Sequence, residues 1–233
     1  MAMEYIRTRT ARTVIRSFTW NIDDGETSMR IGVRKKDREF LGVGRWRIFH
    51  SESNNTSGKD KIIYVQVKAR NVSELLMERK IHKLFKRCSR INTLVLNSFS
   101  YDDNALEKSI EFLTKKIRRI EVDSVSCEIS QRLDEATESI LDFTRIVSPR
   151  HLALILGKYD SVMQNVELLQ HFVMEAYKCV PKVEFVDLVY DNVFEENREH
   201  WKKIKDEHFP SLDLVVEDFP KKYVFELSQE INK

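Results

Sequence analysis

Histidines and carboxylates at helical spacing are the first residues in this sequence that could do chemistry. His171 and Glu175 fall one helical turn apart and could share a metal ion. Glu199-His200 and Glu207-His208 are adjacent pairs, but three lysines lie among them. The sequence contains neither a Cys-x-x-Cys nor a His-Glu-x-x-His motif. We therefore expect charged helix surfaces at these positions and predict no metal site and no cofactor.

Nucleophilic catalysis needs an activated serine or cysteine, and the sequence lacks the Gly-x-Ser-x-Gly elbow. Cys88, Cys127 and Cys179 are odd in number, far apart, and on or near apolar stripes. This pattern predicts buried free thiols. Asp102-Asp103 fits the start of a helix, where the helix dipole favours negative charge. We therefore expect a protein that is not an enzyme.

Basic residues interleaved with aromatic ones make the strongest case for nucleic-acid binding. Such clusters can contact a phosphate backbone while aromatic rings stack on bases. Of the aromatic residues Trp20, Phe40 and Trp46, the first two occupy strand positions that need a core. RNA binding is therefore the alternative function. Its candidate residues are Arg34, Lys35, Lys36, Arg38, Arg45, Arg47, Lys83, Lys86 and Arg87.

The composition predicts a globular chain, since 42% of the 233 residues are hydrophobic and 33% are charged. The net charge of +2 hides a division, because residues 1–120 carry +12 and the remainder −10. This division could mark a basic partner-binding surface, a pairing between the halves, or two solvated faces, and we favour the last. No apolar run could span a bilayer and no secretory signal is visible. We expect an intracellular protein, cytoplasmic or nuclear, with no membrane contact.

The first part of the chain has the alternation of half-buried strands. In residues 28–34, for example, Met29, Ile31 and Val33 alternate with Arg30, Gly32 and Arg34. A turn around Gly25 joins the first two strands. We predict an antiparallel β-meander of about four strands, with strands at 13–22, 28–34, 39–49 and 61–68.

From Ser73 the sequence alternates between helical and strand patterns. Ser73 can cap a helix whose apolar residues include Leu84 and Cys88. Pro149 and Pro181 end two of the later helices. We predict further helices at 104–116, 130–147, 162–180 and 194–208, and strands at 91–96, 117–122, 151–156, 183–190 and 211–218.

The apolar-x-apolar strand cores recur at intervals of 26, 34, 32 and 26 residues, counted between Leu94, Ile120, Leu154, Val186 and Leu212. Such intervals are typical of leucine-rich-type repeats, in which stacked units bury a shared core. A doubly wound sheet also alternates strands and helices, but no Gly-rich phosphate loop follows any strand.

The fold class is therefore α/β (α+β overall). An N-terminal antiparallel β-meander, residues 1–72, precedes leucine-rich-repeat-like strand-helix units at 73–233 that form a short solenoid. Residues 68–73 contain neither Gly nor Pro, so we expect one continuous structure.

A partner of such a repeat protein would contact the strand face. In each apolar-x-apolar core the middle residue should point away from the helices. An ordinary solvated sheet face is the simpler interpretation of the same positions. The candidate partner-binding residues are Val95, Glu121, Ile155, Asp187 and Asp213.

The layout also resembles a known family. The opening strands TVIRSFTWNIDD and SMRIGVR, the RWRIF segment, the bridging KIHKLFKRCSRINTLVLNSF, and the INTLVL, RRIEV and HLALIL strands are similar to the F-box-associated domains expanded in nematodes, of the FTH type and type B. The resemblance covers most of the chain. It implies a domain that recruits substrate proteins for a ubiquitin ligase.

An F-box itself, a helical module with a Leu-Pro start, is not visible in the sequence. The resemblance therefore implies a protein partner and leaves docking to a Skp1-type adaptor open. A narrower likeness links FTWNI, GRWRIF and YVQV to the first strands of MATH domains. The helices predicted after residue 73 do not continue that fold.

Overall fold

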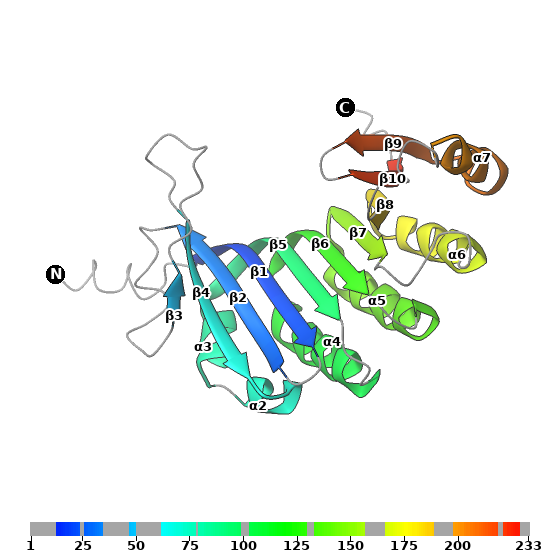
Figure 1. The fold of residues 1–233 in the computed structure, drawn as a ribbon. Coiled ribbons are helices and arrows are strands. Elements are labelled where there is room, and N and C mark those ends of the chain that lie inside the picture. The colour runs from blue at the N-terminus through cyan, green and yellow to red at the C-terminus, as the bar shows by residue number, and fades with distance from the viewer. Residues whose placement is uncertain are drawn as a thin grey trace.

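The computed structural model describes residues 13–23, 26–34, 47–49, 62–77, 79–98, 103–129, 133–156, 166–188, 198–218 and 221–228. Strands dominate the first part, and helices alternate with strands afterwards, so the chain is a mixed α/β protein (Figure 1). The elements are β1 (Thr13–Asp23), β2 (Glu26–Arg34), β3 (Arg47–Phe49), β4 (Ile62–Ala69), α2 (Val72–Leu76), α3 (Arg79–Arg87), β5 (Cys88–Ser98), α4 (Asp103–Ile117), β6 (Glu121–Ile129), α5 (Leu133–Val147), β7 (His151–Leu156), α6 (Val166–Tyr177), β8 (Lys182–Leu188), α7 (Arg198–His208), β9 (Asp213–Asp218) and β10 (Lys221–Ser228).

The described strands form one ten-stranded sheet in the order β3-β4-β2-β1-β5-β6-β7-β8-β10-β9. The first four strands pair antiparallel, as predicted, but β4 lies between β2 and β3. The predicted meander, in which the four strands would follow one another in chain order, is therefore wrong. All eight residues of β4 pair with β2, whereas the three-residue β3 lies at the sheet edge, where very short strands are common.

Strand β1 connects the antiparallel and the parallel parts of the sheet. It pairs antiparallel with β2 on one side and parallel with β5 on the other, where Phe18 lies opposite Leu94 and Trp20 opposite Leu96. One hydrophobic core contains residues from Ile15 to Leu212. Sheet and core therefore continue through residues 72 and 73, where the sequence placed a boundary.

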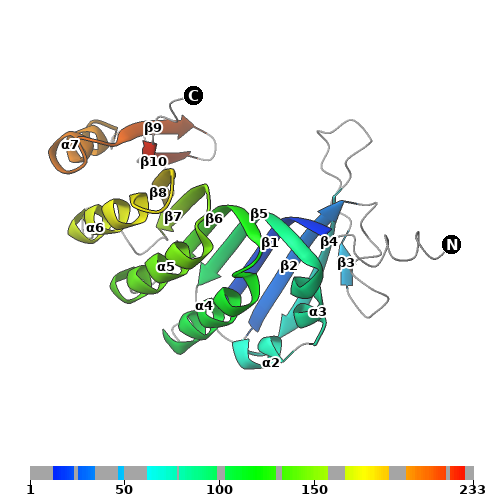
Figure 2. The same cartoon turned by 180° about the vertical axis from the view of Figure 1, so that it is seen from behind.

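Helices α2 to α6 lie along one face of the sheet, and no described helix covers the other face (Figures 1 and 2). Neighbouring helices pack in chain order, α4 against α5 and α5 against α6. This one-sided arrangement explains the alternating burial of the strands, because only side chains under the helices enter the core.

The parallel strands and β1 share one spacing of buried side chains. A buried apolar residue is followed by two less buried residues, and then by two buried residues separated by one position. A common spacing lets neighbouring strands keep the same bend and stay in register. The sets are Ile15, Phe18 and Trp20; Ile91, Leu94 and Leu96; Val122, Val125 and Cys127; Pro149, Leu152 and Leu154; Val180, Val183 and Phe185.

Strand pairing corrects the predicted alignment of the units. Leu94 lies opposite Val125, and Val125, Leu152 and Val183 follow in register, at intervals of 31, 27 and 31 residues. The predicted strand at 117–122 was wrong, because Ile117 ends helix α4 and β6 begins at Glu121. A short apolar pattern fits the end of a helix as well as a strand, and here it shifted the alignment.

The helix predicted from Ser73 is two helices with a different cap. Asn71 is the N-cap of α2, and its side-chain oxygen accepts a hydrogen bond from the Glu74 backbone N–H at 2.9 Å. Helix α3 is separate and ends at Arg87, so Cys88 begins β5 instead of extending the helix. Asn and Ser are equally good caps, so composition alone did not distinguish positions 71 and 73.

The helix end predicted at Pro149 is confirmed. Helix α5 ends at Val147, Ser148 has a φ of 47°, and its backbone N–H donates to the Thr144 carbonyl at 2.7 Å. This left-handed residue closes the helix, and Pro149 cannot continue it.

Strand β10 was not predicted from the sequence. It pairs antiparallel with both β8 and β9, and therefore separates the last predicted strand from the parallel series. The parallel series thus comprises β1, β5, β6, β7 and β8, and β9 lies at the sheet edge.

Candidate functional site

The sheet surface opposite the helices, which we call the open face, is the first candidate site. In the parallel strands its residues alternate with core residues and are mostly small and polar, with a few apolar and charged side chains. Strand pairing arranges them in rows across the sheet. The rows are Ser17, Thr93, Ser124, His151 and Lys182; Thr19, Val95, Ser126, Ala153 and Glu184; and Asn21, Asn97, Glu128, Ile155 and Val186.

The five predicted partner-binding residues do not form one row. Val95 and Ile155 are half-buried on the open face in adjacent rows, and Asp213 extends the row of Val95 through β10. Glu121 lies at the start of β6 and pairs with Arg90, outside these rows. Asp187 is in backbone register with Leu156 of the covered face, outside these rows.

Two hydrogen-bond acceptors of the open face, near the carboxyl ends of β5 and β6, lack a donor among the described residues. Asn97 Nδ2 donates to Asn21 Oδ1 at 2.9 Å, whereas Asn97 Oδ1 is buried without a hydrogen-bond partner. Glu128 is its register neighbour on β6, and burial raises the pKa of this half-buried carboxyl group. Among the described residues no cation pairs with Glu128. A local sequence pattern could not bring these two residues together, because their pairing depends on the strand register.

Ser124, His151 and Glu184 form a polar line across three adjacent strands. Ser124 Oγ lies 3.2 Å from His151 Nδ1, and His151 Nε2 lies 3.1 Å from Glu184 Oε1. The second contact is within ion-pair distance, although its alignment falls short of a hydrogen bond. Burial would raise the pKa of Glu184, but His151 and Lys182 outweigh burial and hold that pKa below its ordinary value.

This line has the residue types of a hydrolytic triad. However, Ser124 lies inside a sheet between two paired strands, where neighbouring backbone N–H groups serve the ladder. Acyl transfer needs N–H groups that point at a developing oxyanion. We interpret the line as a polar ladder of the open face.

The predicted RNA-binding residues are only partly within the described residues. Lys83, Lys86 and Arg87 are exposed on α3, and Arg34 is half-buried on β2. Only the backbone of Arg47 is described. Lys35, Lys36, Arg38 and Arg45 lie outside the described residues.

A groove between α3 and the end of α4 is the second candidate site. Its volume is about 570 Å³, and its walls carry Lys86, Lys115, Lys116, Arg118 and Arg119. Of these residues, only Lys86 was predicted from the sequence. The run Lys-Lys-Ile-Arg-Arg at 115–119 was the available signal, but the prediction divided it between a helix ending at 116 and a strand beginning at 117.

Trp20 and Phe40 were the aromatic residues expected in the core, and only Trp20 is among the described residues. Trp20 is fully buried, and its ring lies 6.1 Å from Phe18 and 5.8 Å from Phe112 between centroids. Trp20 Nε1 donates to Ser109 Oγ at 3.1 Å. Phe40 and Trp46 lie outside the described residues.

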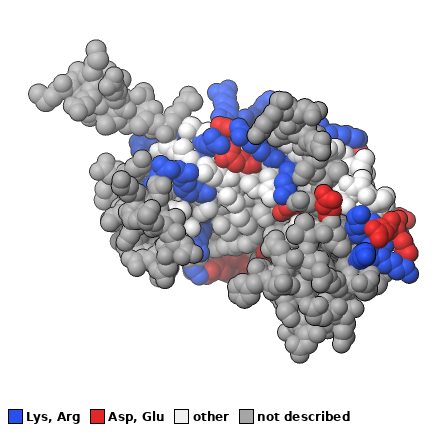
Figure 3. All heavy atoms as spheres, turned by 90° about the horizontal axis from the view of Figure 1, so that it is seen from above, with Lys and Arg blue, Asp and Glu red and all other residues white. Residues whose placement is uncertain are grey.

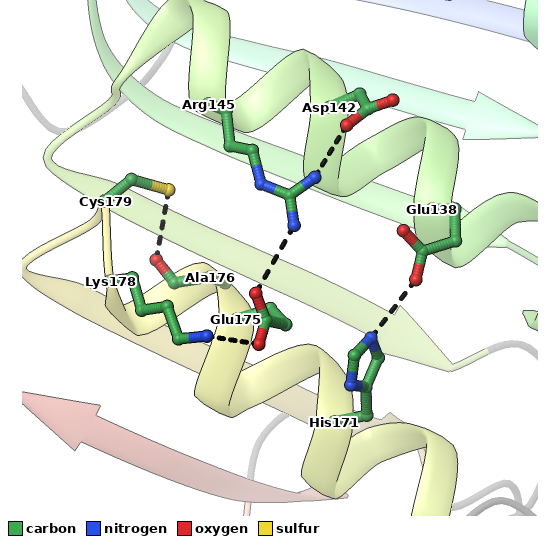
Figure 4. Close-up of polar contacts among 8 residues, drawn as sticks. All are labelled: Glu138, Asp142, Arg145, His171, Glu175, Ala176, Lys178 and Cys179. Atoms are coloured by element: carbon green, nitrogen blue, oxygen red, sulfur yellow. Dashed lines mark hydrogen bonds and ion pairs between the residues drawn. The ribbon is translucent and has the colours of Figure 1, made fainter.

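His171 and Glu175 turn to different partners on the helix surface (Figure 4). His171 Nε2 lies 3.2 Å from Glu138, and Glu175 pairs with Arg145 at 3.4 Å and with Lys178. Within the described ranges, no group of three or more His, Cys, Asp or Glu side chains could hold a metal ion. The arrangement is a set of ion pairs that joins α5 to α6.

The cysteines are free, as predicted. Cys88 and Cys127 are buried, and burial raises their pKa values to about 11 and about 12. Burial also raises the pKa of the half-buried Cys179. All three are therefore poor nucleophiles near neutral pH, since the thiolate is the reactive form.

The basic and acidic halves of the sequence meet at β5 and β6. Arg90 makes two hydrogen bonds to Asp123, at 2.9 Å from Nε and 2.6 Å from Nη2, and approaches Glu121 at 3.9 Å. Figure 3 shows basic and acidic side chains side by side on the surface seen from above. Some basic residues of the first half of the sequence therefore pair with acidic residues of the second half.

Comparisons with known proteins do not extend these observations. No protein-family model matches the chain, and no curated protein or solved structure is significantly similar to it. None of the helices in the described ranges is both long and apolar enough to cross a membrane.

Proposed function

We propose that the chain is a non-enzymatic protein-binding module that recruits a protein partner through the open face of its sheet. The observation that carries this proposal is the pair of acceptors Asn97 Oδ1 and Glu128, which have no donor among the described residues. A half-buried carboxylate without a cation costs stability. Local violations of this kind are expected where a surface is used for function.

The chemistry of the acceptor pair indicates the partner group. A guanidinium or ammonium group offers several N–H donors and a charge that would neutralise Glu128. Ile155 lies in the same row as Asn97 and Glu128, and Val95 lies in the adjacent row. Both are half-buried apolar residues. The aliphatic stem of an Arg or Lys side chain can pack on such residues while its head reaches the acceptors.

The layout of the fold supports the recruiting role that the resemblance to F-box-associated domains of nematodes implies. Strand-helix units stacked in chain order, with helices on one face and exposed strands on the other, form the binding surface of leucine-rich-type solenoids. The regular intervals of 31, 27 and 31 residues support such units here. We propose a substrate-recruiting role in a ubiquitin ligase, in the cytoplasm or nucleus.

The test is affinity purification with mass spectrometry from the cells in which the protein occurs, with the full chain as bait. Glu128→Lys places a like charge where the partner cation would bind and should lose the partner. Glu207→Lys, a matched reversal at an exposed position of α7, should retain it. If the two variants recover the same proteins as the original chain, the open face is not the recruiting surface.

RNA binding is the second candidate function, because Lys83, Lys86 and Arg87 are exposed on one helix and no described acidic residue pairs with them. The buried Trp20 and Phe85 cannot supply stacking platforms. Binding would therefore be electrostatic, and the affinity for single-stranded RNA would fall steeply with salt concentration. Absence of binding at low salt would remove this candidate.

A further inference from the structure

The groove between α3 and α4 gathers positive charge from two helices and the turn that follows α4. Lys86 belongs to the last turn of α3, Lys115 and Lys116 belong to the last turn of α4, and Arg118 and Arg119 form the turn before β6. None of the described residues that line the groove is acidic. A space of about 570 Å³ is within the usual range for small-ligand sites.

Most of this charge is not neutralised by carboxylates in the described ranges. Lys115 Nζ pairs with Glu111 at 2.5 Å, and Lys116 Nζ lies 5.5 Å from the centroid of the Phe112 ring. Among the described residues no carboxylate pairs with Lys86, Arg118 or Arg119. Five like charges around one space repel each other, and a bound anion would relieve that repulsion.

Helix dipoles explain the positions of some of these basic side chains, but not of all of them. A lysine in the last turn of a helix is stabilised by the negative end of the dipole, and this accounts for Lys86, Lys115 and Lys116. Arg118 and Arg119 follow the end of α4 and are exposed. The helix dipole does not account for these two arginines, so their position on the wall of the same groove is the observation that indicates a ligand.

We propose that this groove binds a compact ligand with clustered phosphate groups. Arg and Lys together suit such a ligand, because Arg binds phosphate oxygens in pairs and Lys acts as a point charge. This site is separate from the open face, because the groove is lined mainly by α3, α4 and the turn that follows α4.

A compact ligand fits the groove better than a nucleic-acid strand. Phe85 is buried and cannot stack on a base. His82 Nε2 donates to the Leu76 carbonyl at 2.8 Å, and the His82 ring meets Phe112 edge-on at 5.4 Å between centroids. Both aromatic groups of this wall are therefore committed to the protein, which leaves charge as the means of recognition.

The experiment is isothermal titration calorimetry of the full chain with inorganic triphosphate at low salt. We expect saturable binding that weakens with added salt, and a loss of about tenfold or more in affinity for the double variant Arg118→Gln/Arg119→Gln. The matched control Lys202→Gln/Lys203→Gln removes the same charge from exposed positions of α7 and should keep the affinity within about twofold. Both variants should unfold within about 2 °C of the original chain, since all four residues are exposed.

Two further measurements distinguish the source of the phosphate groups. Binding to vesicles that contain phosphatidylinositol 4,5-bisphosphate, but not to phosphatidylserine vesicles of equal charge, would identify a lipid headgroup. Binding to triphosphate without either vesicle would identify a free ligand. The proposal is overturned if triphosphate does not bind, if both double variants weaken binding equally, or if only single-stranded RNA binds. None of these outcomes depends on partner recruitment by the open face.

Discussion

The two faces of the sheet use the same strands for different purposes. On the face under the helices, Ile15, Leu94, Val125 and Leu152 are almost inaccessible to solvent and belong to one core. On the open face, the alternating residues are small, polar or half-buried, and the acceptors Asn97 Oδ1 and Glu128 lack donors within the described part of the chain. The difference indicates that stability resides on the covered face, which leaves the open face available for binding.

The largest effect should come from truncation of a covered-face residue. Trp20→Ala removes a fully buried ring and leaves Ser109 without its donor, so we expect a loss of about 3–5 kcal/mol in the free energy of unfolding. Guanidinium titration followed by circular dichroism measures this loss. Trp20→Phe retains most of the apolar contact and should cost clearly less. A loss below about 1 kcal/mol for Trp20→Ala would contradict the division between the faces.

Close packing on the open face should produce the next effect. A Cβ at Gly32 would lie 2.6 Å from Ser17 Oγ and 2.9 Å from Tyr64 Cε1. Gly32→Ala should therefore cost about 1–3 kcal/mol through overpacking, measured by the same titration. In the double variant with Ser17→Ala, part of the loss should be recovered, because the nearest atom is gone. Equal losses with and without Ser17→Ala would show that the contact with Ser17 is unimportant.

The ion pairs of Glu184 should produce a smaller, pH-dependent effect. The pKa of Glu184 lies below the ordinary value of 4.5, so the folded state gains stability from the ionised form. This gain is present above pH 4.5 and is lost as the pH falls through the lower pKa of the folded state. Glu184→Gln should cost about 1 kcal/mol at pH 6 and progressively less in acid. Unfolding titrations from pH 6 to pH 3 measure the difference, and a cost that does not change with pH would contradict it.

Glu128 should show the smallest effect, with the opposite sign. Burial raises its pKa, so the ionised form opposes folding. Below pH 4.5 the group is protonated in both states and costs nothing, and the penalty grows as the pH rises through the raised pKa. Because the side chain is half-exposed, Glu128→Gln should stabilise the protein by only a few tenths of a kcal/mol at pH 7. Thermal unfolding at pH 4 and pH 7 measures the change, and destabilisation by Glu128→Gln at pH 7 would indicate a pairing cation.

The strand-helix order could be predicted from the sequence because apolar periodicity is a local signal. Strand β7, at His151–Leu156, has the predicted bounds, and Pro149 ends α5 as predicted. The same local signal failed at residues 117–122, where Ile117 and Ile120 fit both the end of a helix and a strand. The error in this unit placed Glu121 among the partner-binding candidates. Asp187 has a separate cause, because Val186 was taken as a core residue although it is in register with Ile155 of the open face.

The sequence by itself determined the alternating elements, the burial of Cys88 and Cys127 and the placement of Trp20 in the core, because each depends on local pattern and hydrophobicity. Only the tertiary structure placed β4 beside β2, inserted β10 between β8 and β9, and paired Asn97 with Glu128. It also brought Lys86 and Arg118 to one groove. These outcomes depend on strand register and on contacts between residues distant in the chain, which no local pattern encodes.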